Sequence, residues 1–158
     1  MYLLLGVMSI DYDHAGNIIQ IIAALPGFLR KSTIRNKLKE FYSTTEADRH
    51  EVICLTLTAI PTIEDTKLST LVKSWLEVLS EFDGSKISVL FRIYCEEIVR
   101  NPAIVTRINI DPLIKTLLLF TDKQKQKFID CLIEVILSSP NKNELLKLLP
   151  CSLLKILE

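Results

Sequence analysis

The pattern that decides the fold lies in residues 68–82, which read Leu-Ser-Thr-Leu-Val-Lys-Ser-Trp-Leu-Glu-Val-Leu-Ser-Glu-Phe. Large apolar side chains recur there at intervals of three and four residues, while Lys73, Glu77 and Glu81 occupy the opposite face. This spacing is typical of an amphipathic helix. We expect the helix to end at Asp83 and Gly84, with the glycine in the left-handed conformation that commonly closes helices.

The same spacing recurs in two later segments, residues 87–98 and 128–136. Each stops shortly before a proline, because the residue that precedes a proline disfavours helical geometry. Candidate helix starts have a side chain that can accept from the backbone, followed three residues later by an acid or an amide: Thr45, Thr62, Thr121 and Asn141. No stretch shows the sustained alternation that is typical of strands. The sequence therefore predicts an all-α fold of about eight or nine helices.

The helical segments recur at a regular interval. An L-x-K-[ST] pattern begins at Leu29, Leu71 and Leu113, each 42 residues after the last. Prolines recur in a matching phase, at Pro26, Pro61, Pro102 and Pro140. Two antiparallel helices in about 40 residues is the period of HEAT or armadillo repeats, in which stacked helix pairs bury a common core.

Residues 26–149 therefore resemble a HEAT-like α-solenoid. Asp83 and Asp122 look like the turn aspartate of that family, and Arg92 or Lys127 looks like its basic residue. The resemblance implies one helical domain over residues 1–158, stacked as a short right-handed solenoid. Its parts are helix-pair repeats at 26–61, 62–102 and 103–140 and a C-terminal helical cap at 141–158. The alternative architecture is an irregular compact helical bundle.

In such solenoids the second helices of the pairs line a concave surface, where a partner protein docks. The resemblance implies that the partner-binding residues are Arg92, Glu96, Arg100, Lys123 and Lys127. Since the first three recur every four residues, a competing interpretation is a ladder of ion pairs along one helix.

Charge is uneven along the chain although it sums to zero, with 19 basic and 19 acidic residues. Residues 30–39 hold five cations and no acid. Lys31, Arg35 and Lys39 form one stripe on a helix, which would meet phosphates in a nucleic-acid-binding regulator. The competing interpretation is a solvated helix face that lies against the acidic segment 64–83.

Few residues indicate chemistry. The four glycines are too scattered to form a phosphate-binding loop. His50-Glu51-x-x-Cys54, with Glu46 on the same helix face, echoes a zinc motif, but the chain has only two histidines. The polar cluster Asp11-Tyr12-Asp13-His14 is explained by capping of a helix. We therefore expect no enzyme, no cofactor and no metal.

The four cysteines are far apart with no C-x-x-C among them, which is typical of a reducing compartment. The apolar run at residues 2–8 has no preceding cation, and the longest apolar segments are too short to span a bilayer. These features predict a cytoplasmic protein without a membrane partner.

The last residues, 145–157, are rich in leucine. Because the end of a repeat stack normally has a polar outer face, this tail is expected either to dock back on the core or to be buried against another chain, as in a homodimer. The sequence as a whole predicts a non-catalytic intracellular helical-repeat protein that acts as a protein–protein interaction scaffold or adaptor. The alternative is the nucleic-acid-binding regulator that uses residues 30–39.

Overall fold

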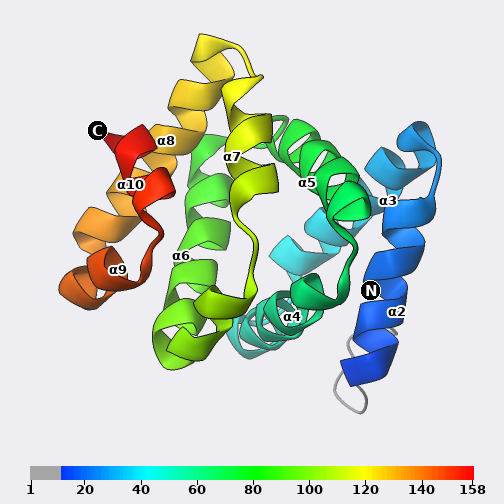
Figure 1. The fold of residues 1–158 in the computed structure, drawn as a ribbon, viewed down its shortest axis with the longest axis horizontal. Coiled ribbons are helices and arrows are strands. Elements are labelled where there is room, and N and C mark those ends of the chain that lie inside the picture. Colours follow the sequence, from blue (N-terminus) through cyan, green and yellow to red (C-terminus); the bar gives the residue numbers. More distant parts are fainter. Residues whose placement is uncertain (1–11) are drawn as a thin grey trace. The chain divides into compact units, whose positions relative to one another are not determined.

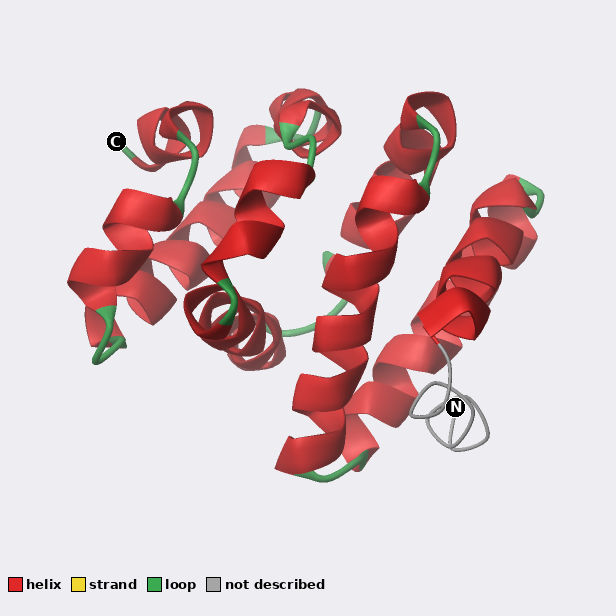
Figure 2. Cartoon of the chain, turned by 60° about the horizontal axis from the view of Figure 1, so that its bottom comes forward, coloured by secondary structure: helices red, strands yellow, loops and turns green. Residues whose placement is uncertain are grey.

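A computed structural model of the chain describes residues 12–158, and their side chains from residue 18 onward. Within that range the chain consists of helices and loops and contains no strand (Figure 2). The predicted all-α class is therefore confirmed. The polar cluster at residues 11–14 lies outside the described side chains.

The chain divides into two compact units, Met1–Leu79 (unit 1) and Ser80–Glu158 (unit 2). The described helices of unit 1 are α2 (Tyr12–Ala24), α3 (Gly27–Ser43), α4 (Glu46–Ala59), the short 3-10 helix η1 (Ile60–Thr62) and α5 (Asp65–Leu79) (Figure 1). The main contacts join helices two apart in the chain, because α2 packs on α4 and α3 packs on α5.

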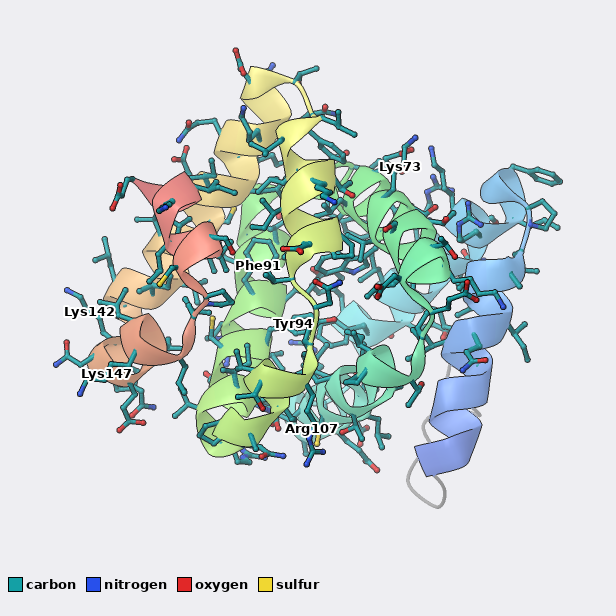
Figure 3. The ribbon with its side chains drawn as sticks, in the orientation of Figure 1. Lys73, Phe91, Tyr94, Arg107, Lys142 and Lys147 are labelled. Atoms are coloured by element: carbon teal, nitrogen blue, oxygen red, sulfur yellow. The ribbon has the colours of Figure 1, made fainter. Side chains whose placement is uncertain are left out.

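The apolar spacing of the sequence accounts for how unit 1 packs. On α5, Leu68, Leu76 and Leu79 are buried, whereas Lys73 is exposed on another face of the helix (Figure 3). Full burial of each such leucine contributes about 1.5–3 kcal/mol. Helices α3 and α4 of the same unit also bury apolar side chains: Ile34, Leu38, Phe41, Ile53, Leu55, Leu57 and Ala59.

Unit 2 is built around α6 and α8, which share the most extensive helix–helix contact of the unit. Its helices are α6 (Gly84–Arg100), the 3-10 helix η2 (Pro102–Arg107), α7 (Asp111–Leu118), α8 (Asp122–Ser138), α9 (Lys142–Leu148) and α10 (Cys151–Leu157) (Figure 1). The prolines at the predicted boundaries all lie outside the α-helices: Pro26, Pro61, Pro102 and Pro140.

The leucine-rich C-terminal tail docks back on unit 2. Leu145 of α9 is 1% exposed and packs with Cys95 and Val135, from α6 and α8. Leu149 and Leu153 form a second buried cluster with apolar side chains of α8. The structure therefore shows docking of the tail on the core, and a homodimer formed through the tail stays a prediction.

Two predicted helix starts are confirmed. Thr45 precedes α4, and its hydroxyl accepts from the Asp48 N–H at 3.2 Å. Thr121 precedes α8, and its hydroxyl accepts from the Gln124 N–H at 3.2 Å. Each hydroxyl satisfies one of the amides that a first helical turn leaves free.

The other two predicted starts differ from the structure. Thr62 is not a cap, because it lies in η1 and its hydroxyl donates to the Ala59 carbonyl at 2.6 Å. The chain therefore continues α4 as a tighter turn, and α5 begins only at Asp65. Asn141 does precede α9, but its side chain makes no capping hydrogen bond.

The prediction that Gly84 closes the preceding helix in a left-handed conformation is wrong. α5 ends at Leu79, Gly84 is the first residue of α6, and no glycine among the described residues has a positive φ. Asp83 caps α6 instead: its Oδ1 accepts from the Lys86 N–H at 3.0 Å and from the Ser85 hydroxyl at 2.5 Å. The start of the next helix thus determines this turn.

The division into repeats stays a prediction. The boundary between the two units falls after Leu79, inside the range 62–102 that was expected to be one repeat. The three L-x-K-[ST] stretches also differ in environment, since Ser74 and Thr116 are buried whereas Ser32 is exposed. Among residues 12–158 the structure contains no helix with the length and apolar character needed to cross a bilayer.

Candidate functional site

The predicted partner-binding residues of α6 form ion pairs along the helix. Arg92 Nη1 lies 2.9 Å from Glu96 Oε1, and both side chains are half-exposed. Arg100, which is largely exposed, pairs at 3.1 Å with Glu97, a buried carboxylate that the sequence analysis did not select. One rung of the predicted ladder is therefore present, and Arg100 takes a different partner. Exposed pairs of this kind contribute a few tenths of a kcal/mol.

The predicted residues of α8 have different environments. Lys123 is exposed in the first turn of the helix. Lys127 is half-buried, and its Nζ donates to the Phe82 carbonyl at 2.6 Å and to the Ser80 carbonyl at 3.2 Å. Lys127 therefore holds the turn that precedes α6. A partner site formed by the α6 and α8 residues stays a prediction.

Arg30 plays a similar part in unit 1. Its guanidinium donates to the Leu25 carbonyl at 2.6 Å and to the Ala23 carbonyl at 3.4 Å, both at the C-terminal end of α2. Its Nε also donates to the hydroxyl of Ser74, a buried residue of α5, at 2.8 Å. Because the last carbonyls of a helix have no partner within it, a cation placed there donates hydrogen bonds to them and interacts favourably with the negative end of the helix dipole.

Arg49 of α4 is a third cation of this kind. It donates to the Phe41 carbonyl at 3.1 Å and to the Tyr42 carbonyl at 2.6 Å, at the end of α3. Its guanidinium also lies over the Phe41 ring, 5.7 Å from the ring centre. Arg49 was not predicted from the sequence, although a basic side chain soon after a helix-ending turn is a usable signal.

The basic segment 30–39 meets the acidic segment inside unit 1. Lys31 of α3 forms an ion pair with Glu77 of α5. Arg35 is half-buried, and Lys39 is exposed. The contact supports the interpretation in which a basic helix face lies against an acidic one, and the nucleic-acid interface stays a prediction.

His50 lies on α4 one turn after Glu46, with 3.5 Å between Nε2 and Glu46 Oε1. This contact is an ion pair when the imidazole is protonated. Cys54 follows one turn later and is half-buried. The expectation that this motif holds no metal stays a prediction.

Two cysteines of unit 2, Cys95 and Cys131, are buried. Burial and the neighbouring Glu96 raise the pKa of the Cys95 thiol to about 12, so the thiol is protonated at neutral pH. The buried Cys131 thiol donates to the Gly84 carbonyl at 3.5 Å. Neither residue has the exposed, electropositive surroundings that activate a nucleophilic cysteine.

Large exposed apolar side chains gather at two turns between helices. The first turn, which we call the α2–α3 corner, exposes 75% of Phe28, 61% of Ile21 and 43% of Leu29. The second, the α7–α8 corner, exposes 82% of Leu119 and 55% of Leu118. Neither corner was predicted from the sequence, because apolar periodicity alone does not show which apolar residues are left outside the core. Exposed apolar patches are typical of interaction sites.

The fold defines the described chain as an all-α protein, and comparison with known proteins assigns it to no narrower class. No protein-family model, curated protein or solved structure matches the chain significantly.

Proposed function

We propose that the protein is a non-catalytic scaffold or adaptor that binds a protein partner through the α2–α3 corner. The observation that carries the proposal is the 75% exposure of Phe28, together with the exposure of Leu29, the next residue of α3, and of Ile21, in the last turn of α2. Residues 15–29 contain no charged side chain. Aromatic and aliphatic anchors of this kind provide most of the binding free energy at protein interfaces.

The α2–α3 corner is held in place before any partner binds. The Leu25 N–H donates to the Ile22 carbonyl at 3.2 Å, and the Arg30 N–H donates to the Pro26 carbonyl at 2.8 Å. The Arg30 side chain joins the same corner to Ser74 of α5. A partner therefore meets a preorganised surface, and little conformational entropy is lost on binding.

We further propose that the helix pairs stack as short HEAT-like repeats. Packing between helices two apart supports this, namely α2 with α4, α3 with α5 and α6 with α8, because stacked hairpins bring equivalent helices together. All four cysteines are free thiols, which supports a cytoplasmic setting.

Site-specific photo-crosslinking tests the function. In one version of the protein a photoreactive phenylalanine analogue replaces Phe28. In a control version the same analogue replaces Leu137, an apolar side chain of α8 that is 61% exposed. Inside cells we expect a defined protein to be crosslinked from position 28 and not from position 137. The substitution Phe28→Ser should weaken binding of that purified partner about tenfold or more, as loss of an aromatic anchor does.

The proposal fails if position 28 crosslinks to no protein, or to the same mixture as position 137. It also fails if Phe28→Ser leaves the affinity for the crosslinked partner unchanged.

A further inference from the structure

The α7–α8 corner projects at one end of unit 2, beyond the neighbouring helices of that unit (Figure 1). Leu118 is the last residue of α7, and Leu119 follows it directly. Their exposed fractions of 55% and 82% mean that both side chains point mainly into solvent. The corner thus presents two adjacent leucines on a projecting surface.

Two backbone donors of the corner are satisfied within the turn, and one of its aromatic rings is packed. The Leu119 N–H donates to the Thr116 carbonyl at 3.1 Å, and the Phe120 N–H donates to the Leu117 carbonyl at 3.2 Å. The Phe120 ring packs at 5.8 Å against Phe128 of α8. Because these amides already have partners, moving the corner into an apolar medium does not leave them without a hydrogen bond.

Cations flank the two leucines. Lys115 is exposed on α7, three and four residues before the leucines and therefore on their side of the helix. Lys123 is exposed in the first turn of α8. The acid at this corner, Asp122, lies 3.6 Å from Lys125, so its charge is balanced locally. Residues 115–125 thus hold three lysines and one aspartate, an excess of two positive charges in the segment that contains the two leucines.

From this juxtaposition we infer that the α7–α8 corner docks on an anionic lipid surface. Leu118 and Leu119 enter the region of the lipid headgroups, and Lys115 and Lys123 contact the lipid phosphates. A projecting apolar tip fits a flat bilayer surface better than it fits a protein groove, and the combination of apolar insertion with basic residues is what weak, reversible membrane attachment requires.

This inference goes beyond the proposed protein partner and rests on a different part of the chain. The sequence predicts no membrane partner because it contains no spanning segment, and docking of one corner requires none. The α2–α3 corner lacks the same charge complementarity. Its nearest cations are Arg30, which binds backbone carbonyls, and Lys31, which pairs with Glu77.

Cosedimentation of the full chain with lipid vesicles tests the inference. We expect binding to phosphatidylcholine vesicles that contain phosphatidylserine, much weaker binding to phosphatidylcholine alone, and loss of binding as salt is raised. The double substitution Leu118→Asn and Leu119→Asn should lower the partition coefficient about tenfold or more. The double substitution Lys115→Gln and Lys123→Gln should lower it about tenfold.

Matched variants serve as controls. Leu137→Asn removes another exposed leucine of unit 2, and Lys142→Gln with Lys147→Gln removes two exposed lysines of α9 (Figure 3). Both should bind the anionic vesicles as the unchanged protein does, and circular dichroism should show that every variant is helical.

Three results would overturn the inference. The first is absence of binding to anionic vesicles, and the second is an equal loss of binding in the control variants. The third is a corner that crosslinks to a protein while the anionic vesicles stay unbound, which would assign the α7–α8 corner to a protein partner.

Discussion

The α2–α3 corner and the α7–α8 corner are built alike and differ in what their cations do. Each exposes adjacent apolar side chains at a turn between two helices. At the first corner the neighbouring cation, Arg30, is bound to backbone carbonyls and to Ser74. At the second, Lys115 and Lys123 are exposed. What an exposed apolar corner can bind therefore depends on its neighbouring cations, which either form hydrogen bonds within the fold or are exposed to a ligand.

The same contrast holds inside unit 2. Lys123 and Lys127 are one turn apart on α8, yet only Lys127 reaches the turn carbonyls of residues 80 and 82. Stability and binding measurements on matched variants test these differences.

The largest effect is expected from the core between α6, α8 and α9 of unit 2. Leu145→Ala removes a side chain that is 1% exposed and leaves a cavity between α6, α8 and α9. Urea unfolding should show a loss of about 2–5 kcal/mol. Its neighbour Leu146 is 39% exposed, so Leu146→Ala should cost less than about 1 kcal/mol. Equal losses would contradict the packing of α9.

Arg30→Met should lower the free energy of unfolding by about 1–3 kcal/mol, because the buried Ser74 hydroxyl and the last carbonyls of α2 lose their donor. The matched variant Lys39→Met removes an exposed cation from the same helix and should change stability by less than about 0.5 kcal/mol. Chemical denaturation of both variants is the measurement. A stability loss for Arg30→Met that is no larger than the loss for Lys39→Met would contradict the role assigned to Arg30.

Lys127→Met should cost about 1–2 kcal/mol, since the Ser80 and Phe82 carbonyls lose a charged donor. Lys123→Met should leave stability within about 0.5 kcal/mol of the unchanged protein. Vesicle binding should follow the opposite order, with Lys123→Met weakened and folded Lys127→Met retained. If both lysines affect both properties equally, the contrast between them does not hold.

Gly84→Ala should be neutral or stabilise the protein by up to about 1 kcal/mol. Gly84 opens α6 without a positive φ, and an added Cβ would lie 3.6 Å from Cys131 Sγ, an ordinary contact. Alanine also lowers the entropy of the unfolded chain. A marked fall in the thermal midpoint would instead indicate the left-handed conformation that the sequence suggested.

The smallest effect concerns acid pH and the start of α6. Hydrogen bonds from the Ser85 hydroxyl and the Lys86 N–H hold the pKa of the Asp83 carboxyl below its ordinary value of 3.8. A depressed folded-state pKa means that the stabilisation is present above the ordinary pKa and is lost as pH falls through the lower, folded one. Urea midpoints at successive pH values below 5 should therefore fall more steeply in the unchanged protein than in Asp83→Asn. Parallel curves would show that Asp83 does not contribute to the pH dependence.

Much of the helical order was predictable because its causes are local. The stop before Asn101 and Pro102 follows from proline sterics, and the starts after Thr45 and Thr121 follow from hydroxyls that accept from free amides. Where two local signals compete, the prediction fails. At residues 83 and 84, an aspartate that opens one helix stood beside a glycine that was interpreted as closing another.

The candidate sites were much less predictable. Arg92 and Glu96 pair as a four-residue spacing suggests. No local pattern shows that Arg30 reaches Ser74, 44 residues away, or that Lys127 reaches Ser80, 47 residues away. The two exposed corners were missed for the same reason, because Phe28 and Leu119 resemble core residues until the core is assembled.

The sequence by itself determined that the described part of the chain is all-helical and where some of its helices begin and end, because side-chain periodicity and turn chemistry act over a few residues. Only the tertiary structure decided which cations bind backbone carbonyls and which are exposed, and which leucines are buried. Those outcomes depend on contacts between residues far apart in the chain, and such contacts cannot be inferred from composition and local spacing.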